Sequence, residues 1–119
     1  MRTYLECVPC FFKQALDASV LAGADKKTQK KILRKLAQKV LSFDTRQCPT
    51  AMGMVLYRLV RKTTGNNDPF KEIKKKSNAL ALALYPRLKE KVQKAKDPLL
   101  AAIELAIAGN IIDYGTKHP

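Results

Sequence analysis

Between Leu99 and Ile112 every residue is apolar or glycine except Glu104 and Asn110. A helix that is apolar on all sides is normally buried, either in a protein core or in a membrane. This run is too short for a membrane, because a spanning helix needs about 20 apolar residues. We therefore expect an interior helix close to the end of the chain, and a fold that covers it on every side.

Helix start and stop signals divide the rest of the chain. Asp68-Pro69 and Asp97-Pro98 each combine a capping carboxylate with a proline suited to the first helical turn, and Gly23 follows a helical segment as a terminating glycine. The apolar periodicity predicts helices over residues 3–22, 26–43, 49–64, 69–95 and 98–112. Pro86 is expected to kink the fourth or to split it in two. With no convincing strand, the predicted fold is all-α, a compact array of five or six helices.

The apolar spacing also predicts which face each helix buries. In the first helix the expected buried residues are Leu5, Val8, Phe12, Ala15, Leu16, Ser19 and Val20. In the second they are Ile32, Leu33, Leu36, Val40 and Leu41, and in the third Met52, Met54, Val55, Leu56, Leu59 and Val60. The lysines of the second helix occupy most of its remaining surface, as in an amphipathic surface helix.

The polar stretch from Gly65 to Asp68 is the best internal boundary. We expect a helical subdomain over residues 1–66 and a second over residues 67–119. The amino-terminal stretch carries Glu6 and two cysteines, so it does not resemble a signal peptide. We therefore expect a soluble cytoplasmic protein with no membrane partner.

The chain is strongly basic, with 23 Lys and Arg against 10 Asp and Glu and a formal charge of +13. We interpret the lysine-rich residues 26–39 and 71–76 first as solvated surface. A helix-turn-helix reader would need side chains that recognise base edges, and the helix behind the short Gly23-Ala24-Asp25 turn offers mostly lysines. We expect only non-specific attraction to nucleic acid. A basic helical module that binds nucleic acid or an acidic partner remains the alternative function.

Cys7 and Cys10 form a Cys-x-x-Cys pair near the start of the chain. A structural zinc site needs four ligands, and only Cys48 and His118 could complete this one. We interpret the pair first as packing residues, because they alternate with apolar neighbours. A metal or redox role, and with it a stand-alone zinc or redox module, stays open as a third hypothesis.

The motif Gly109-Asn110-Ile111-Ile112-Asp113 ends the apolar segment. Asn110 and Asp113 are three residues apart and share one helix face. A carboxylate near a helix carboxyl terminus opposes the helix dipole and calls for a compensating cation or metal. Gly109 would let a ligand or another backbone approach closely. The alternative is a packed Asn110 beside a solvated Asp113.

Three stretches, YLECVPCFFKQAL, TGNNDPFKEIKKKSNALALALYPRL and KDPLLAAIELAIAGNIIDYG, resemble in this order the damage-control phosphatases, formerly domain of unknown function eighty-nine. The resemblance extends over essentially the whole chain and indicates the stand-alone branch with an amino-terminal Cys-x-x-Cys. It implies hydrolysis of phosphate esters of small metabolites, such as sugar phosphates or nucleotide-related compounds. It also implies a divalent metal, which could be manganese, nickel, cobalt or magnesium.

The resemblance further implies a helical amino-terminal region joined to a Rossmann-like α/β domain that carries the metal ligands. No such half is present here, so we expect the ligands beyond residue 119 and this chain alone to be inactive. Gly109, Asn110 and Asp113 match the family's GNxxD motif and are expected beside the active site rather than as metal ligands. The expected partners are a phosphorylated small-molecule substrate and the α/β domain.

Overall fold

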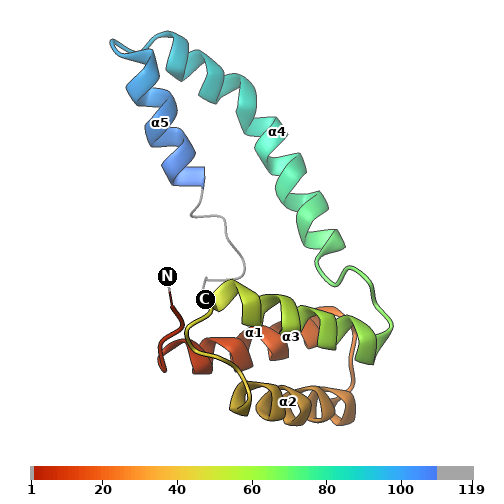
Figure 1. Ribbon diagram of the computed structural model, residues 1–119. Coiled ribbons are helices and arrows are strands. Elements are labelled where there is room, and N and C mark those ends of the chain that lie inside the picture. Colours follow the sequence, from red (N-terminus) through yellow and green to blue (C-terminus); the bar gives the residue numbers. More distant parts are fainter. Residues whose placement is uncertain (1, 110–119) are drawn as a thin grey trace. The chain divides into compact units, whose positions relative to one another are not determined.

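The computed structural model describes residues 2–109, which form five helices and no strand (Figure 1). The helices are α1 (Cys7–Leu21), α2 (Lys26–Leu41), α3 (Pro49–Thr64), α4 (Lys71–Gln93) and α5 (Pro98–Gly109). The all-α prediction is confirmed for this part of the chain. The chain divides into two units, Met1–Glu72 and Ile73–Pro119, which we call unit 1 and unit 2.

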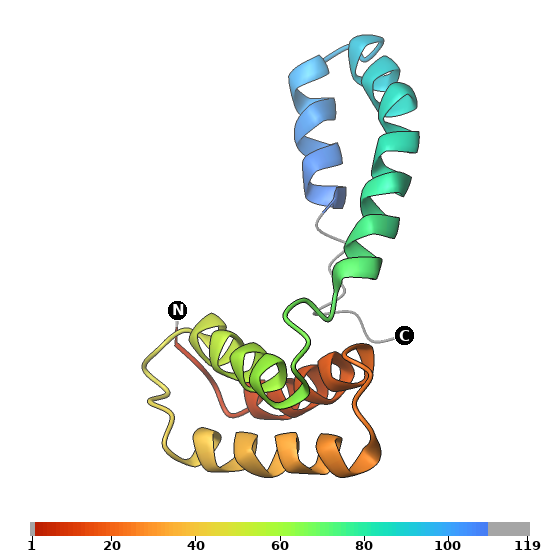
Figure 2. The same cartoon turned by 90° about the vertical axis from the view of Figure 1, so that its right-hand side faces the viewer.

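Unit 1 is a three-helix arrangement in which α1, α2 and α3 each contact the other two. Figures 1 and 2 show that α1 and α3 run in the same direction. The helix α2 runs in the opposite direction, from the end of α1 to the loop before α3. The buried side chains recur three or four residues apart, which places them on one face of each helix. They are Phe11, Ala15, Ala18, Ile32, Leu36, Met52, Leu56 and Val60.

The buried faces differ in part from the predicted ones. In α1 the core takes Phe11 and Ala18, whereas Val20 is 54% exposed. Apolar residues occupy two sides of α1, so its periodicity leaves the rotation of the helix undecided. Its partner helices meet the side that carries the small alanines. Leu41 and Met54 were also expected in the core, and they are 88% and 66% exposed.

The turn between α1 and α2 is held by its own side chains. Gly23 has a φ of 78°, a left-handed conformation that favours glycine. Asp25 caps α2, because its Oδ1 accepts a hydrogen bond from the Thr28 N–H at 2.8 Å. The buried Gln29 donates from Nε2 to the Ala24 carbonyl at 2.7 Å. These bonds fix the tight reversal that lets α2 pack on α1.

Residues before Cys7 do not extend α1, although the sequence predicts a helix from residue 3. The Thr3 N–H donates to the carbonyls of Thr45 and Gln47, both at 2.9 Å. The Thr3 hydroxyl donates to the Gln47 carbonyl as well, at 2.8 Å. The buried Thr3 is therefore fastened to the α2–α3 loop instead of joining the helix.

The link from α3 to α4 is a series of local turns. Gly65 ends α3 with a φ of 74°. Asn66 Oδ1 accepts from the Asp68 N–H at 3.0 Å, and Asp68 Oδ1 accepts from the Phe70 N–H at 3.2 Å. The Phe70 ring meets Tyr57 edge-on, with 5.6 Å between centroids. Because these turns occupy Pro69 and Phe70, α4 begins at Lys71 rather than at the predicted proline.

Unit 2 contains most of α4, a short turn and α5, which turns back alongside α4 (Figures 1 and 2). Of the two expected effects of Pro86, a kink or a split, the split does not occur, because α4 continues through Pro86 as one helix. Neither helix has a buried residue. The helix that the sequence predicts to be interior is α5, and none of its described residues is buried. The large apolar side chains left exposed are Leu80, Leu82, Leu84, Tyr85, Leu88, Leu99, Leu100, Ile103 and Ile107.

Candidate functional site

The two cysteines of the Cys-x-x-Cys pair differ in their surroundings. Cys7 is the first residue of α1 and is half-buried against the core of unit 1. Cys10 lies nearly one turn further on and is exposed. Packing therefore accounts for Cys7 but not for Cys10. Both are free cysteines.

Cys48 is the thiol whose environment the sequence reasoning overlooked. It is the N-cap of α3 and is exposed, with its Sγ 2.9 Å from the Thr50 hydroxyl oxygen. The hydrogen bond with the Thr50 side chain, followed by the one from the Ala51 N–H, lowers the pKa of the Cys48 thiol. The signal in the sequence was Cys48-Pro49-Thr50, which reads as an N-cap, a first-turn proline and a hydroxyl donor.

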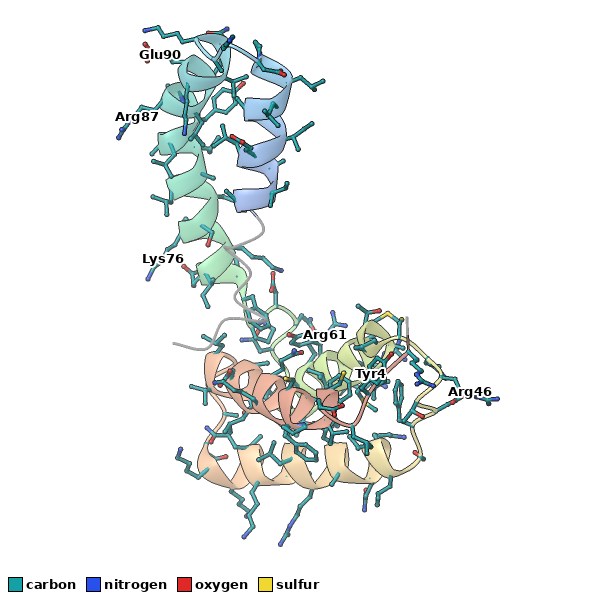
Figure 3. All side chains as sticks on the ribbon, turned by 90° about the vertical axis from the view of Figure 1, so that its left-hand side faces the viewer. Tyr4, Arg46, Arg61, Lys76, Arg87 and Glu90 are labelled. Carbon is teal, nitrogen blue, oxygen red and sulfur yellow. The ribbon has the colours of Figure 1, made fainter. Side chains whose placement is uncertain are left out.

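All three thiols belong to the end of unit 1 where α1 and α3 begin. The hydrogen bonds from Thr3 to Gln47 join the two chain segments there. Figure 3 shows Tyr4 and Arg46 at this same end. No group of three or more His, Cys, Asp or Glu side chains that could hold a metal occurs among residues 2–109. The cysteines therefore do not assemble into a metal site in the described part of the chain.

The carboxylates of the described residues are largely used to hold the helices. Asp97 caps α5 through a hydrogen bond from the Leu100 N–H at 3.0 Å, as Asp25 caps α2. Asp44 accepts from Arg46 at 2.9 Å, and this hydrogen bond lowers the pKa of the Asp44 carboxyl. Asp17 pairs with Lys13 at 3.2 Å. A divalent metal needs several oxygen ligands that converge, and these carboxylates are distributed over separate helix starts and turns.

Of the GNxxD motif, Gly109 is the last residue of α5. A Cβ placed on Gly109 would meet no atom within 4 Å, so no backbone among residues 2–109 makes the expected close approach. Asn110 and Asp113 lie outside the described residues. The structure places only Gly109 of this motif, as the last residue of an apolar helix that has no buried residue.

No helix among residues 2–109 is long and apolar enough to cross a membrane. The basic side chains of residues 26–39 all lie on the exposed surface of α2, and the described acidic residues include none on this helix. The structure thus confirms the amphipathic character of α2.

The family model of the damage-control phosphatase ARMT1-like domain matches residues 3–118. The chain is 30% identical over 116 residues to a damage-control phosphatase of Pyrococcus horikoshii, an alignment that covers 96% of this chain and 39% of the relative. It is 30% identical over 76 residues to a damage-control phosphatase of Archaeoglobus fulgidus, covering 64% of this chain and 26% of that protein.

An uncharacterised protein of Methanocaldococcus jannaschii is 29% identical over 117 residues, with 92% of this chain and 37% of that protein covered. No solved structure matches the chain. The chain therefore spans less than two fifths of the length of the relatives that it matches nearly end to end.

Proposed function

This chain belongs to the family of the damage-control phosphatase ARMT1-like domain, and we propose from that membership that it is the helical part of a metal-dependent phosphatase. The proposed reaction is hydrolysis of a phosphate monoester on a small metabolite, a sugar phosphate or a nucleotide-related compound. The observation that carries the proposal is the family match over residues 3–118, supported by two relatives that are named damage-control phosphatases.

The proposal places the metal ligands outside residues 2–109. Several of these carboxylates cap helices or form ion pairs, and no three His, Cys, Asp or Glu side chains among residues 2–109 converge, so they do not fit a metal centre. A divalent metal, once bound, would polarise the phosphoryl group and activate a water molecule. We propose that its ligands belong to an α/β domain that this chain does not include, and we derive no step of the reaction through them.

We place Gly109, Asn110 and Asp113 at the edge of the active site. This assignment rests on the family motif and on the position of Gly109 at the end of α5. A carboxamide and a carboxylate one helical turn apart could contact the substrate or orient neighbouring groups. Two such side chains are too few for a complete coordination shell. They are therefore assigned to positioning rather than to metal binding.

The apolar surface of unit 2 fits the same proposal. Leu99 is 71% exposed and Ile107 is 65% exposed on α5, and Leu82 is 73% exposed on α4. Monomeric proteins rarely leave such a large apolar surface uncovered. We propose that the α/β domain of the complete protein covers it, which would bring the end of α5 next to the catalytic groups.

The test is a phosphatase assay with p-nitrophenyl phosphate and sugar phosphates in the presence of manganese. We expect no useful turnover by the 119-residue chain and clear turnover by the complete protein. In the complete protein, Asn110→Ala and Asp113→Ala should lower kcat/KM by at least about tenfold, a loss of roughly 1.4 kcal/mol of transition-state stabilisation.

Asp17→Ala is the matched control, because Asp17 is an exposed carboxylate that pairs with Lys13 and is distant from the motif in sequence. It should leave kcat/KM unchanged, and melting temperatures should show that all three variants remain folded. Robust hydrolysis by the 119-residue chain alone would contradict the proposal that the metal ligands belong to an α/β domain outside it. Unchanged turnover in Asn110→Ala and Asp113→Ala would remove the motif from the site.

A further inference from the structure

The exposed surface of α2 carries two parallel rows of cations. One row is Lys27, Lys31, Lys35 and Lys39, and the other is Lys26, Lys30 and Arg34. Members of a row are four residues apart, which is about 6 Å along the helix axis. All of these side chains are exposed. In Figure 3 nitrogen-tipped side chains extend from α2 on the side away from α1 and α3. We call this surface the α2 cation face.

The charges of the α2 cation face destabilise the helix that carries them. Like charges four residues apart repel each other, and the two rows consist entirely of such pairs. Lys26 and Lys27 also lie at the positive end of the helix dipole, in a first turn with no acidic residue. None of these cations takes part in the ion pairs that the structure describes. The N-cap carboxylate of Asp25 attracts Lys27 and offsets part of this repulsion. A local arrangement that otherwise opposes folding is typical of a functional surface.

The other side of α2 limits what the α2 cation face can bind. A helix that lies on a lipid surface inserts its apolar residues between the lipids. Within α2, Ile32 and Leu36 are fully buried in the core, and the one large apolar side chain that is exposed is Leu41, the last residue of the helix, at 88%. Between Lys26 and Lys39 the exposed surface presents no aromatic or large apolar side chain that could anchor a peptide. The remaining feature is the two rows of positive charges. A polyanion whose negative charges are regularly spaced would complement them.

We propose that the α2 cation face binds the phosphate backbone of double-stranded nucleic acid without reading its sequence. Lysine contacts phosphates as a flexible point charge, whereas base recognition relies on bidentate Arg, Asn or Gln contacts. Arg34 alone in the two rows has such a group, and the exposed Gln38 is a further one on α2. The binding is weak and falls steeply with salt, because release of counterions from the duplex drives it.

The experiment measures binding of the 119-residue chain to a fluorescently labelled duplex of mixed sequence over a range of salt concentrations. The test variant is Lys27→Gln/Lys31→Gln/Lys35→Gln, which keeps good helix formers at all three positions. We expect its affinity to fall at least about tenfold at low salt, and the slope of log K against log salt to become shallower by roughly 3. Its Tm should be no lower than that of the parent chain, because repulsive pairs have been removed.

The matched control is Lys75→Gln/Lys76→Gln/Lys89→Gln, which removes the same charge from exposed positions of α4. It should change the affinity by less than about threefold. Equal losses in the two variants would overturn the proposal, because net charge alone would then explain binding. Binding to vesicles of anionic lipid but not to the duplex would overturn it in favour of a membrane surface. A preference for one sequence would contradict the backbone contact.

Discussion

At the start of α2, one carboxylate has a measurable thermodynamic role. Asp25 Oδ1 accepts the Thr28 N–H at 2.8 Å, and this bond lowers the pKa of Asp25 below 3.8. A lowered pKa means that ionised Asp25 stabilises the folded state above pH 3.8, and that this stability is lost as the pH falls through the lowered pKa. We expect Asp25→Ala to lower the Tm at pH 7, and the difference from the parent chain to shrink below pH 3.8 in thermal melts followed by circular dichroism.

Asp25→Asn is the control for this prediction. Asparagine caps helices about as well as aspartate but does not titrate. Its Tm at pH 7 should stay near that of the parent chain. If Asp25→Asn were as destabilised as Asp25→Ala, the negative charge among the lysines of α2 would matter rather than the hydrogen bond.

Within α3, two methionines of the same helix have opposite surroundings. Met52 is 1% exposed and Met54 is 66% exposed. Removing a buried methionine side chain loses its transfer free energy and leaves a cavity. We expect Met52→Ala to lower the free energy of unfolding by about 2–5 kcal/mol, and Met54→Ala to change it by less than about 0.5 kcal/mol. Urea unfolding followed by circular dichroism measures both, and equal losses would contradict the described face of α3.

The same helices show what local patterns can predict. Starts of helices follow from short-range chemistry, so Pro49 and Asp97-Pro98 located α3 and α5 to the residue. The rotation of a helix depends on its neighbours, so the periodicity of α1 predicted Phe12 on the buried face, whereas the structure buries Phe11 and leaves Phe12 half-buried. Pro86 illustrates the reverse case, because a proline removes one donor and strains the helix but the rest of α4 continues around it.

For the molecule as a whole, the uncovered apolar surface of unit 2 has a consequence in solution. We expect the 119-residue chain to bind the dye ANS and to self-associate. The triple variant Leu82→Gln/Leu99→Gln/Ile107→Gln should reduce both by removing three side chains that are 65–73% exposed. Dye fluorescence and sedimentation velocity measure these effects.

The control substitutes three exposed apolar residues of unit 1, Leu5→Gln, Leu41→Gln and Met54→Gln, which are 66–88% exposed. Singly scattered apolar side chains are normal on protein surfaces, so this variant should retain the dye binding and the association. Loss of both properties in the control would show that unit 2 is not their source.

The candidate site could be predicted only in part, because the groups of a site come together only in the folded protein. Sequence spacing predicts that Asn110 and Asp113 share one helix face, which lies outside the described residues, and their assignment to a phosphatase came from the family resemblance. Ligands of a metal converge from residues that are distant in sequence, and no short motif within 119 residues specifies that convergence. Cys48 was missed because its thiol acquires its character from a cap geometry that only the folded loop creates.

The fastening of Thr3 to Gln47 has a consequence for how the protein is made. The two residues are 44 positions apart, and the bond between them closes the amino terminus onto the loop before α3. A ribosome adds about 5–20 residues per second, so the amino terminus waits roughly 2–9 s for its acceptor carbonyl to be synthesised. Until then α1 lacks its amino-terminal anchor, and for almost as long it lacks Phe43, whose ring meets Phe11 edge-on. The apolar side chains of α1 are therefore accessible to a nascent-chain chaperone in that interval.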